Sequence, residues 1–544
     1  MGLQEMIERG REAFRLFINN EYYDGYFLLD KHAKESFYHS LGKALVLSLR
    51  FGATLNLEHY KKAWEATMRA VRLINNHRHQ HSTAQKASSF IFKSDYADWT
   101  DMECHAELVF AEICAAYALL IVVNDRSITG LVKAVFKIKT CHSCYKRCNS
   151  ILKHRKRWDD PEMRQHFESG VLLGLGLFDM AISLFPTQMI RLLELAGFSG
   201  NRHMGMTQLM ACEKLTEGIR YPVVSIVMSG YFGFGEFFYG LGEPDVDCII
   251  RIHDYWQPKT PASIAVVMGS AFRATWAGDF EAATKFYDEY ASRQTIVKAF
   301  HYIAHWQKMW IYSCQWDWEK VCENSHILVK ECPWSPSMFA YIHACSLSML
   351  AEEKDCQELR TKVSHYFRQA IKLKRTFGGK RSFHEKLVSD KAKIFMENPS
   401  RVILAPLDLM YLWNTFTIAG RNPDCLPNIL SKIEERLETY TRESDIEMYA
   451  YLTFMKGICF SHSNFPLAAA DCFFELLDFE KQLKLENHLI PQACFEVGQI
   501  YRRMNDFSEA KKWYKKAKTY DNYMTDGLIK FRVEAALHSM KSNS

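Results

Sequence analysis

Three groups of cysteine and histidine side chains have spacings that could hold a transition metal. Thiolate sulfur and imidazole nitrogen are the ligands that zinc prefers, so each group is a candidate for metal chemistry. The groups are Cys141, His142, Cys144 and Cys148; His77, His79 and His81; and His301 with His305.

Each group also has a simpler interpretation as packing. No second pair of ligands follows the cysteines at zinc-finger distance, and on a helix the three cysteines share one face, as core residues do. The alternating histidines fall in residues 75–100, which lose helical periodicity and are expected to form a loop. His301 and His305 have Tyr302 where a zinc protease has glutamate, and packing against nearby tryptophans explains them. We therefore predict no metal and no cofactor.

Glycine clusters raise the possibility of a phosphate-binding loop or a nucleophile elbow. Gly174 and Gly176 lack the third glycine of a dinucleotide fingerprint, and Gly378-Gly379-Lys380 lacks the upstream glycine of a P-loop. The Gly197–Gly200 segment is one residue short of a nucleophile elbow. No strand precedes any of them, so we predict structural turns, no catalytic residue and no enzyme.

The strongest charge feature is a basic segment from Lys133 to Arg157, which has no acidic residue. Most such runs are solvated helix faces. The alternative is a patch for anionic partners, which are membrane headgroups or an acidic protein surface. No stacking aromatics are interleaved as in a single-strand binder, so nucleic acid is not expected. The candidate patch consists of Lys153, Arg155, Lys156 and Arg157.

Composition indicates a folded soluble protein in a reducing compartment. Among 544 residues, 48% are hydrophobic and 24% charged, and the net charge of +5 does not by itself imply a polyanionic partner. Sixteen cysteines lack disulfide-like spacing, and no signal peptide or lipidation motif is found. Cytoplasmic localisation is expected. The apolar segments 171–185 and 221–242 contain acidic residues, which favours core helices over membrane spans.

The elements that carry these residues are helices, and their pattern is that of tetratricopeptide hairpins. Small residues alternate with aromatic ones so that two antiparallel helices can approach closely. Similar steps occur at Asp279-Phe280, Asp317-Trp318, Asn464-Phe465 and Asp506-Phe507, and Gly457 and Gly498 lie 41 residues apart. The residues predicted to pack the repeats are Ala283, Tyr287, Gly457, Phe460, Gly498, Tyr501, Ala510 and Tyr514.

No stretch alternates like a strand, so the predicted fold is all-α, a superhelical array of tetratricopeptide-like helical hairpins. We expect N-terminal hairpins over residues 1–165, central apolar helices over 166–258 and C-terminal repeats over 259–541, in one continuous array.

Several separated motifs resemble the tetratricopeptide repeat protein 39 family, which includes the fungal inclusion-body clearance proteins. They are Gly174-Leu-Gly176-Leu-Phe178, Ser183-Leu-Phe-Pro186, Leu192-Leu193, Gly197-Phe198-Ser199-Gly200, Trp334-Ser335, Met410-Tyr411-Leu412-Trp413-Asn414 and Phe416-Thr417-Ile418-Ala419-Gly420. The resemblance covers nearly the whole chain. It implies a helical repeat protein without enzymatic chemistry, associated with lipid and cholesterol handling, protein clearance or cilia.

Two functional hypotheses follow. The first is a protein-binding scaffold whose concave groove, lined by first helices such as Gln492 to Tyr501, grips a segment of another protein. The second is a peripheral membrane or lipid-droplet adaptor acting in protein clearance, which would dock through the basic segment, with the Gly170 to Gly242 helices as a further candidate contact. A cilium-related scaffold is another alternative implied by the resemblance.

Overall fold

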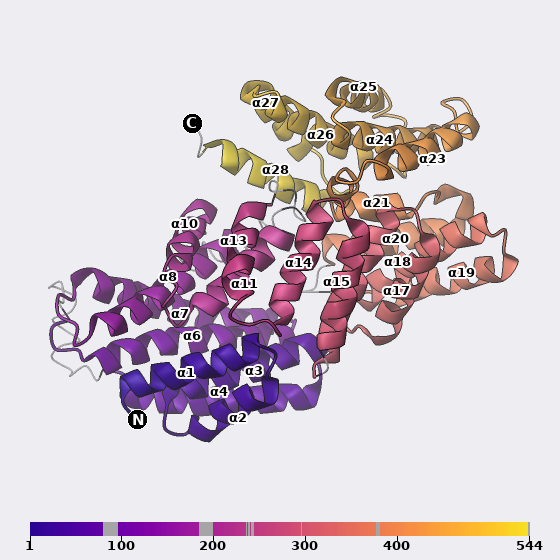
Figure 1. Cartoon of the computed structure of the whole chain (residues 1–544). Coiled ribbons are helices and arrows are strands. Elements are labelled where there is room, and N and C mark those ends of the chain that lie inside the picture. Colours follow the sequence, from indigo (N-terminus) through magenta and orange to yellow (C-terminus); the bar gives the residue numbers. More distant parts are fainter. Residues whose placement is uncertain are drawn as a thin grey trace. The chain divides into compact units, whose positions relative to one another are not determined.

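The computed structural model describes residues 1–79, 96–183, 198, 200–235, 237, 240, 244–294, 296–376 and 381–541. Over these ranges the regular secondary structure is entirely helical (Figure 1). The predicted all-α fold of tetratricopeptide-like hairpins is therefore confirmed. Most of the loop predicted at 75–100, and Gly197 and Ser199 of the predicted central turn, lie outside the described residues.

The chain forms two compact units. Unit 1 comprises residues 1–230, 252–266 and 293–297, and unit 2 comprises 231–251, 267–292 and 298–544. Of the boundaries expected from sequence, residue 165 falls inside a helix of unit 1, Pro161–Ser183. Residue 258 falls within the segment 252–266 that belongs to unit 1.

Unit 1 is built from antiparallel helix pairs. Its helices are α1 (Leu3–Ile18), α2 (Tyr22–His32), α3 (Phe37–Thr54), α4 (Leu57–His77), α6 (Asp101–Asn124), α7 (Ile128–His154), α8 (Pro161–Ser183), α10 (Arg202–Glu213) and α11 (Tyr221–Gly230). The α3–α4 and α6–α7 hairpins pack closely within themselves, and α6 also packs on α3 and α4.

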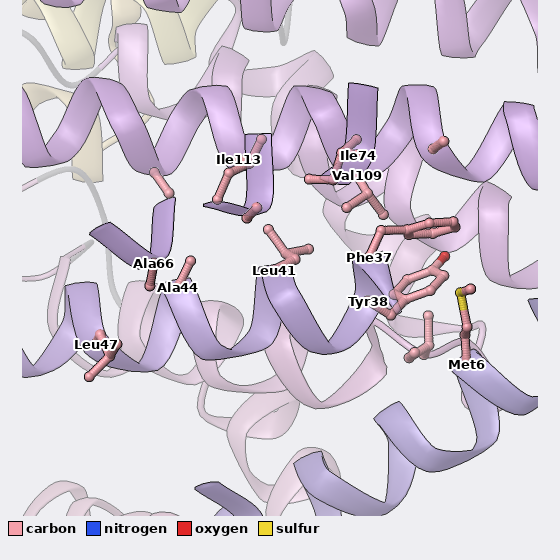
Figure 2. Packing of buried hydrophobic residues seen from close by; sticks show 14 of the residues in the cluster. Met6, Phe37, Tyr38, Leu41, Ala44, Leu47, Ala66, Ile74, Val109 and Ile113 are labelled. Carbon is pink, nitrogen blue, oxygen red and sulfur yellow. The ribbon is translucent and has the colours of Figure 1, made fainter. Parts of the chain in front are cut away.

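The core of unit 1 lies between α1, α3, α4 and α6, where apolar side chains from helices distant in sequence interlock. Figure 2 shows Leu41 of α3, Ile74 of α4 and Ile113 of α6 pointing into this space. Small residues such as Ala44 and Ala66 lie between the helices and let their backbones approach. A hairpin alone would leave this face in water, so each pair depends on the next.

Unit 2 begins with a π-helical turn (Tyr231–Gly235). Helix α13 (Val246–Trp256) starts in unit 2 and ends in unit 1, and α14 (Ile264–Trp276) starts in unit 1 and continues into unit 2. The remaining helices are α15 (Phe280–Arg293), α16 (His301–Cys314), α17 (Trp318–Glu331), α18 (Pro336–Glu353), α19 (Gln357–Lys372), α20 (Phe383–Glu397), α21 (Pro406–Leu412), α22 (Phe416–Ala419), α23 (Cys425–Thr439), α24 (Ile446–His462), α25 (Pro466–Leu477), α26 (Leu489–Arg503), α27 (Phe507–Lys518) and α28 (Asp526–Lys541). Short 3₁₀ turns occur at Lys298–Phe300 and Pro399–Arg401.

One turn recurs between paired helices. A residue with positive φ stands two positions before the second helix, and the next backbone N–H donates to the carbonyl five residues earlier, as in a Schellman ending. At Asn505, φ is 61° and Asp506 N donates to Tyr501 O over 2.9 Å. The positive-φ residues of this turn are Asn20, Gly278, Trp316, Asp355, Asn414, Asn464 and Asn505.

This turn also begins the second helix, because the residue after it often caps the helix. The Asp506 carboxylate accepts from the backbone N–H of Glu509 over 3.0 Å, and Asp279 and Asp317 accept from Ala282 and Lys320 in the same way. Asp279-Phe280, Asp317-Trp318 and Asp506-Phe507 thus occupy equivalent positions in their hairpins. Asn464-Phe465 lies one residue earlier, because Asn464 is itself the positive-φ residue of its turn.

The glycines inside first helices lie where the paired helix approaches most closely. A Cβ on Gly498 would stand 2.6 Å from Cε1 of Tyr514, and one on Gly457 would stand 2.7 Å from Cε1 of Phe473. Ala510 and Tyr514 are fully buried. Among the other predicted packing residues, Ala283 and Tyr287 are buried, and Phe460 and Tyr501 are half-buried.

Candidate binding surfaces

The three candidate metal groups are taken up by packing and hydrogen bonds. Cys141, Cys144 and Cys148 belong to a core cluster with Trp99, and burial raises the pKa of each thiol. His79 pairs with Glu103 over 2.9 Å and stacks on Trp99, while His305 Nδ1 lies 2.9 Å from Asn324 Oδ1. No cluster of three metal-ligating side chains occurs among the described residues.

Helix α6 is long and apolar enough to cross a membrane, and it is the one helix in the described ranges to meet that test. Its acidic residues have partners inside unit 1. Glu107 pairs with Arg78 at 2.7 Å and Arg147 at 2.9 Å, and Glu112 pairs with Arg220 at 2.8 Å. Since 56% of its apolar stretch is also buried, α6 serves as a core helix.

A buried hydrogen-bonded chain runs through unit 1. Arg220 donates to the Tyr38 hydroxyl over 3.0 Å, and that hydroxyl lies 2.6 Å from His105 Nδ1. The other ring nitrogen, Nε2, lies 3.0 Å from the Met163 carbonyl, which accepts its proton. Desolvation, with the Arg220 charge nearby, lowers the pKa of His105 to about 3. The chain holds four segments together and has no exposed end for a substrate.

A second buried group in unit 2 consists of charged side chains. Lys391 Nζ lies 2.7 Å from Glu486 and 3.2 Å from Asp408, and His488 lies 3.6 Å from Glu486. None of the four is more than 6% exposed. They resemble an acid–base site in composition, but no substrate can reach them without unfolding. They therefore stabilise the packing of unit 2.

Neither group was predicted from the sequence. The available signal was a charged residue inside an apolar helical stretch, as for Asp408 between Leu407 and Leu409 and for Glu112 in α6. Such a residue must find a partner when buried. The partner could not be identified, because Glu486 and Arg220 are distant in the sequence.

Acidification is expected to destabilise the protein through buried neutral histidines. His105, His343 and His488 are at most 4% exposed, and burial lowers the pKa of each to about 3. Their folded pKa lies below the unfolded value of 6.5, so the unfolded state takes up protons first and stability is lost as pH falls below 6.5. At pH 5.5, one unit below that value, each histidine lowers the free energy of unfolding by about 1.4 kcal/mol.

The raised pKa values of the buried Asp408 and Glu496 act in the opposite direction, so the net loss is smaller than the sum over three histidines. Urea unfolding at pH 7.5 and at pH 5.5 measures this net loss of stability. A midpoint that is unchanged or higher at pH 5.5 would contradict the prediction.

The first helices of the last two hairpins, α24 and α26, are covered on one side by other segments of the same chain. We call this covered side the inner face. Gln492 of α26 donates to the Thr525 hydroxyl over 2.9 Å, and Glu496 accepts from the Tyr411 hydroxyl over 3.0 Å. Arg532 of α28 donates to the Leu412 carbonyl over 3.0 Å.

This result corrects the expectation of an open groove along Gln492 to Tyr501. From Leu489 to Val497 every residue of α26 is buried. The covering segments are α28 and the α21–α22 stretch. The sequence did not indicate that these segments cover α26, because α28 follows α27 directly and has the pattern of an ordinary repeat helix.

The second helices of these hairpins, with the turns before them, expose large apolar side chains. On α25 and its turn, Phe465 is 59% and Leu467 72% exposed. On α27, the Trp513 ring packs 5.6 Å from that of Phe474, while Lys516 Nζ lies 5.0 Å from the Trp513 ring. We call this the outer surface; its residues are Phe465, Leu467, Phe474, Met504, Phe507 and Trp513.

The basic candidate patch is only partly exposed. Lys153, Lys156 and Arg157 are exposed at the end of α7 and in the segment after it. Arg155 is 8% exposed; it forms an ion pair with the buried Asp101 and donates to the Trp99 carbonyl over 2.8 Å. Arg155 is therefore a core residue and not part of an anion-binding patch, which corrects the sequence interpretation.

Paired helices and a recurring hairpin turn define a helical repeat protein. The family model for Iml2/Tetratricopeptide repeat protein 39 matches residues 11–463, and a tetratricopeptide repeat model matches residues 491–523. The chain belongs to the Iml2/tetratricopeptide repeat protein 39 family. Family membership, expected from the separated motifs, is thus confirmed.

A relative from Caenorhabditis elegans, tetratricopeptide repeat protein ttc-39B, is 26% identical over 540 residues, covering 99% of this chain and 93% of its own. Among solved structures, the P58(IPK) TPR domain is 12% identical with a TM-score of 0.21 and covers 93% of this chain and 99% of its own. Yeast Tom70 is 8% identical with a TM-score of 0.21, and the match covers 99% of this chain and 96% of Tom70.

Proposed function

We propose that this protein is a non-enzymatic scaffold that binds other proteins through the outer surface of its last two hairpins. The observation that carries the proposal is the contrast between the two sides of α24–α27. The inner side is filled by the chain itself, while the outer side leaves aromatic and aliphatic side chains in water. Exposed apolar side chains grouped in this way mark interaction sites.

The chemistry around the outer surface fits a protein partner. Lys511 and Lys515 are exposed on α27 beside the apolar side chains, so a segment with apolar anchors and nearby acidic residues would find complementary groups. Association with lipid or cholesterol handling, implied by family resemblance, would then run through the bound protein.

A reducing, cytoplasmic setting agrees with this proposal. All sixteen cysteines are free, and fifteen of them are buried. Buried thiols of this kind behave as small hydrophobic residues.

The double variant Leu467→Asp/Phe507→Asp is expected to lose partner binding without losing stability. Leu467 is 72% and Phe507 47% exposed, so the substitution removes apolar contact area but little core packing. Partners captured from cells by photo-crosslinking and identified by mass spectrometry should fall at least about tenfold in yield, which corresponds to about 1.4 kcal/mol. The affinity of a purified partner is then measured for the unaltered chain and for the variant, and the variant should bind it more weakly.

The matched control is Phe27→Asp/Leu49→Asp, since these unit 1 side chains are 68% and 67% exposed. It should retain the partners of the unaltered chain. If the outer-surface variant keeps every partner that the control keeps, the proposed binding surface is wrong.

A further inference from the structure

A recess in unit 1 offers a second surface, separate from the outer surface of unit 2. It lies beside α4, near the turn that joins α6 to α7, and has a volume of about 390 Å3. Aromatic rings form its walls: the Trp64 ring packs edge-on against Tyr117 at 5.0 Å and lies 5.8 Å from Tyr60. The lining residues are Tyr60, Trp64, Tyr117, Ile121, Asn124, Asp125, Lys133, Phe136 and Lys137.

One rim of the recess is an apolar ridge on α7. Ile128, Val132 and Phe136 are 66%, 50% and 67% exposed. Their spacing of four residues places them along one side of the helix, about 12 Å from first to last. Phe136 both ends the ridge and lines the recess. Exposing a row of apolar side chains to water is unfavourable, so the ridge is suited to contact with a partner.

Positive charge surrounds the apolar groups. Lys137 Nζ lies 4.6 Å from the centre of the Tyr117 ring, and Lys133 lines the same recess. Lys139, Lys146 and Lys153 follow at seven-residue spacing, in line with Val132 and exposed. In the described parts of the chain, none of these five lysines has a carboxylate within ion-pair distance, and Asp125 is the one acidic side chain of the lining.

We propose that this recess and the α7 lysines dock an acidic segment of another protein, inserting an aromatic or leucine side chain between Tyr117 and Phe136. The concave shape favours a protein segment over a bilayer. A single protruding side chain can fill the recess, whereas a flat membrane surface leaves its aromatic walls uncovered. Anchors four residues apart on an amphipathic helix match the spacing of the ridge.

The lysines on α7 would contribute the electrostatic part of partner recognition. Acidic residues beside the anchor would meet Lys133 and Lys137, and those further along would meet Lys139 and Lys146. Lys133, Lys139 and Lys146 are exposed and Lys137 is half-buried, so these charges would speed association and select acidic partners, and added salt would weaken binding. The apolar anchor would supply the part of the affinity that salt does not remove.

The test is selection from a displayed library of random sixteen-residue peptides on the full-length chain. Counter-selection uses the variant Lys133→Glu/Phe136→Asp/Lys137→Glu, whose altered side chains are at least partly exposed. Peptides that bind the unaltered chain but not this variant should carry an aromatic or leucine anchor with two or more Asp or Glu residues close by. Fluorescence polarisation should show at least about a tenfold weaker affinity for the variant.

A matched control, Lys31→Glu/Lys34→Glu, changes two exposed lysines elsewhere in unit 1 and should leave peptide binding unchanged. Equal thermal melting of all three chains establishes that folding is intact. Binding of the unaltered chain and the variant to phosphatidylserine vesicles is measured in parallel. Three results would each overturn the proposal: no peptide distinguishes the variant from the unaltered chain, the distinguishing peptides lack acidic residues, or the variant loses binding to the vesicles but to no peptide. The outer-surface proposal survives any of these, since its variants lie in unit 2.

Discussion

Replacing Lys391 with methionine is expected to lower the free energy of unfolding of unit 2 by about 3–5 kcal/mol, the range measured when one partner of a buried ion pair is removed. Lys391 is 2% exposed and is the cation between Asp408 and Glu486. Without it, two carboxylates remain in an environment where no water can solvate them. Burial already raises the pKa of Asp408, which shows the strain on its charged form.

The matched control for this substitution lies two residues along the same helix. Lys393→Met removes an exposed lysine that pairs with Asp390 at 3.5 Å, and such surface pairs contribute roughly 0–1 kcal/mol. Urea unfolding followed by circular dichroism measures both variants.

A triple variant distinguishes lost charge balance from lost packing. Adding Asp408→Asn and Glu486→Gln to Lys391→Met removes the uncompensated charges and should recover more than half of the stability. If the single variant loses less than about 1 kcal/mol, the buried ionic group does not hold unit 2 together.

Replacing Arg532 with methionine is expected to lower the free energy of unfolding by about 2–4 kcal/mol and to loosen α28. Arg532 is 2% exposed and donates to the backbone carbonyls of Tyr411 and Leu412 at 3.4 and 3.0 Å. Methionine fills much of the same volume but leaves the Leu412 carbonyl without this donor, and an unsatisfied buried group costs about 1–3 kcal/mol. The Tyr411 carbonyl still accepts from the Asn414 N–H over 3.1 Å. Loss of the nearby positive charge further destabilises the charged form of Glu496.

Limited proteolysis with trypsin reports on α28 separately from global unfolding. Cleavage at Lys530 should become faster in Arg532→Met, because α28 must leave the inner face before the protease can bind it. Glu534→Gln is the matched control on the same helix, since Glu534 pairs with Lys518 at 2.9 Å near the surface. Equal cleavage rates in both variants would mean that Arg532 does not anchor α28.

The sequence was informative about features that depend on neighbouring residues. The approach of Gly498 to Tyr514 and the capping by Asp506 involve residues within one hairpin, and their spacing is visible in the chain. Periodicity also predicted helices throughout, because a buried face leaves its pattern in each helix.

The sequence was less informative where the deciding partner is distant. The charge of Arg155 suggested a surface, yet Asp101 in α6 draws it into the core. The helix from Gln492 to Tyr501 was predicted to line an open groove, yet Thr525 and Tyr411 hydrogen-bond to its Gln492 and Glu496. A polar residue on a helix has the same sequence pattern whether it faces water or a buried partner, so only the tertiary structure separates the two.

The central claim is that partners bind the outside of the last hairpins and that the inside is closed by the chain itself. Site-specific incorporation of p-benzoylphenylalanine in cells tests it directly, with the photoreactive residue at Phe507 on the outer surface or at Phe495 within buried α26. We expect covalent adducts with other proteins from position 507, and only crosslinks within the chain from position 495. Intermolecular adducts from position 495 in a chain with unchanged melting temperature, and none from position 507, would contradict the claim.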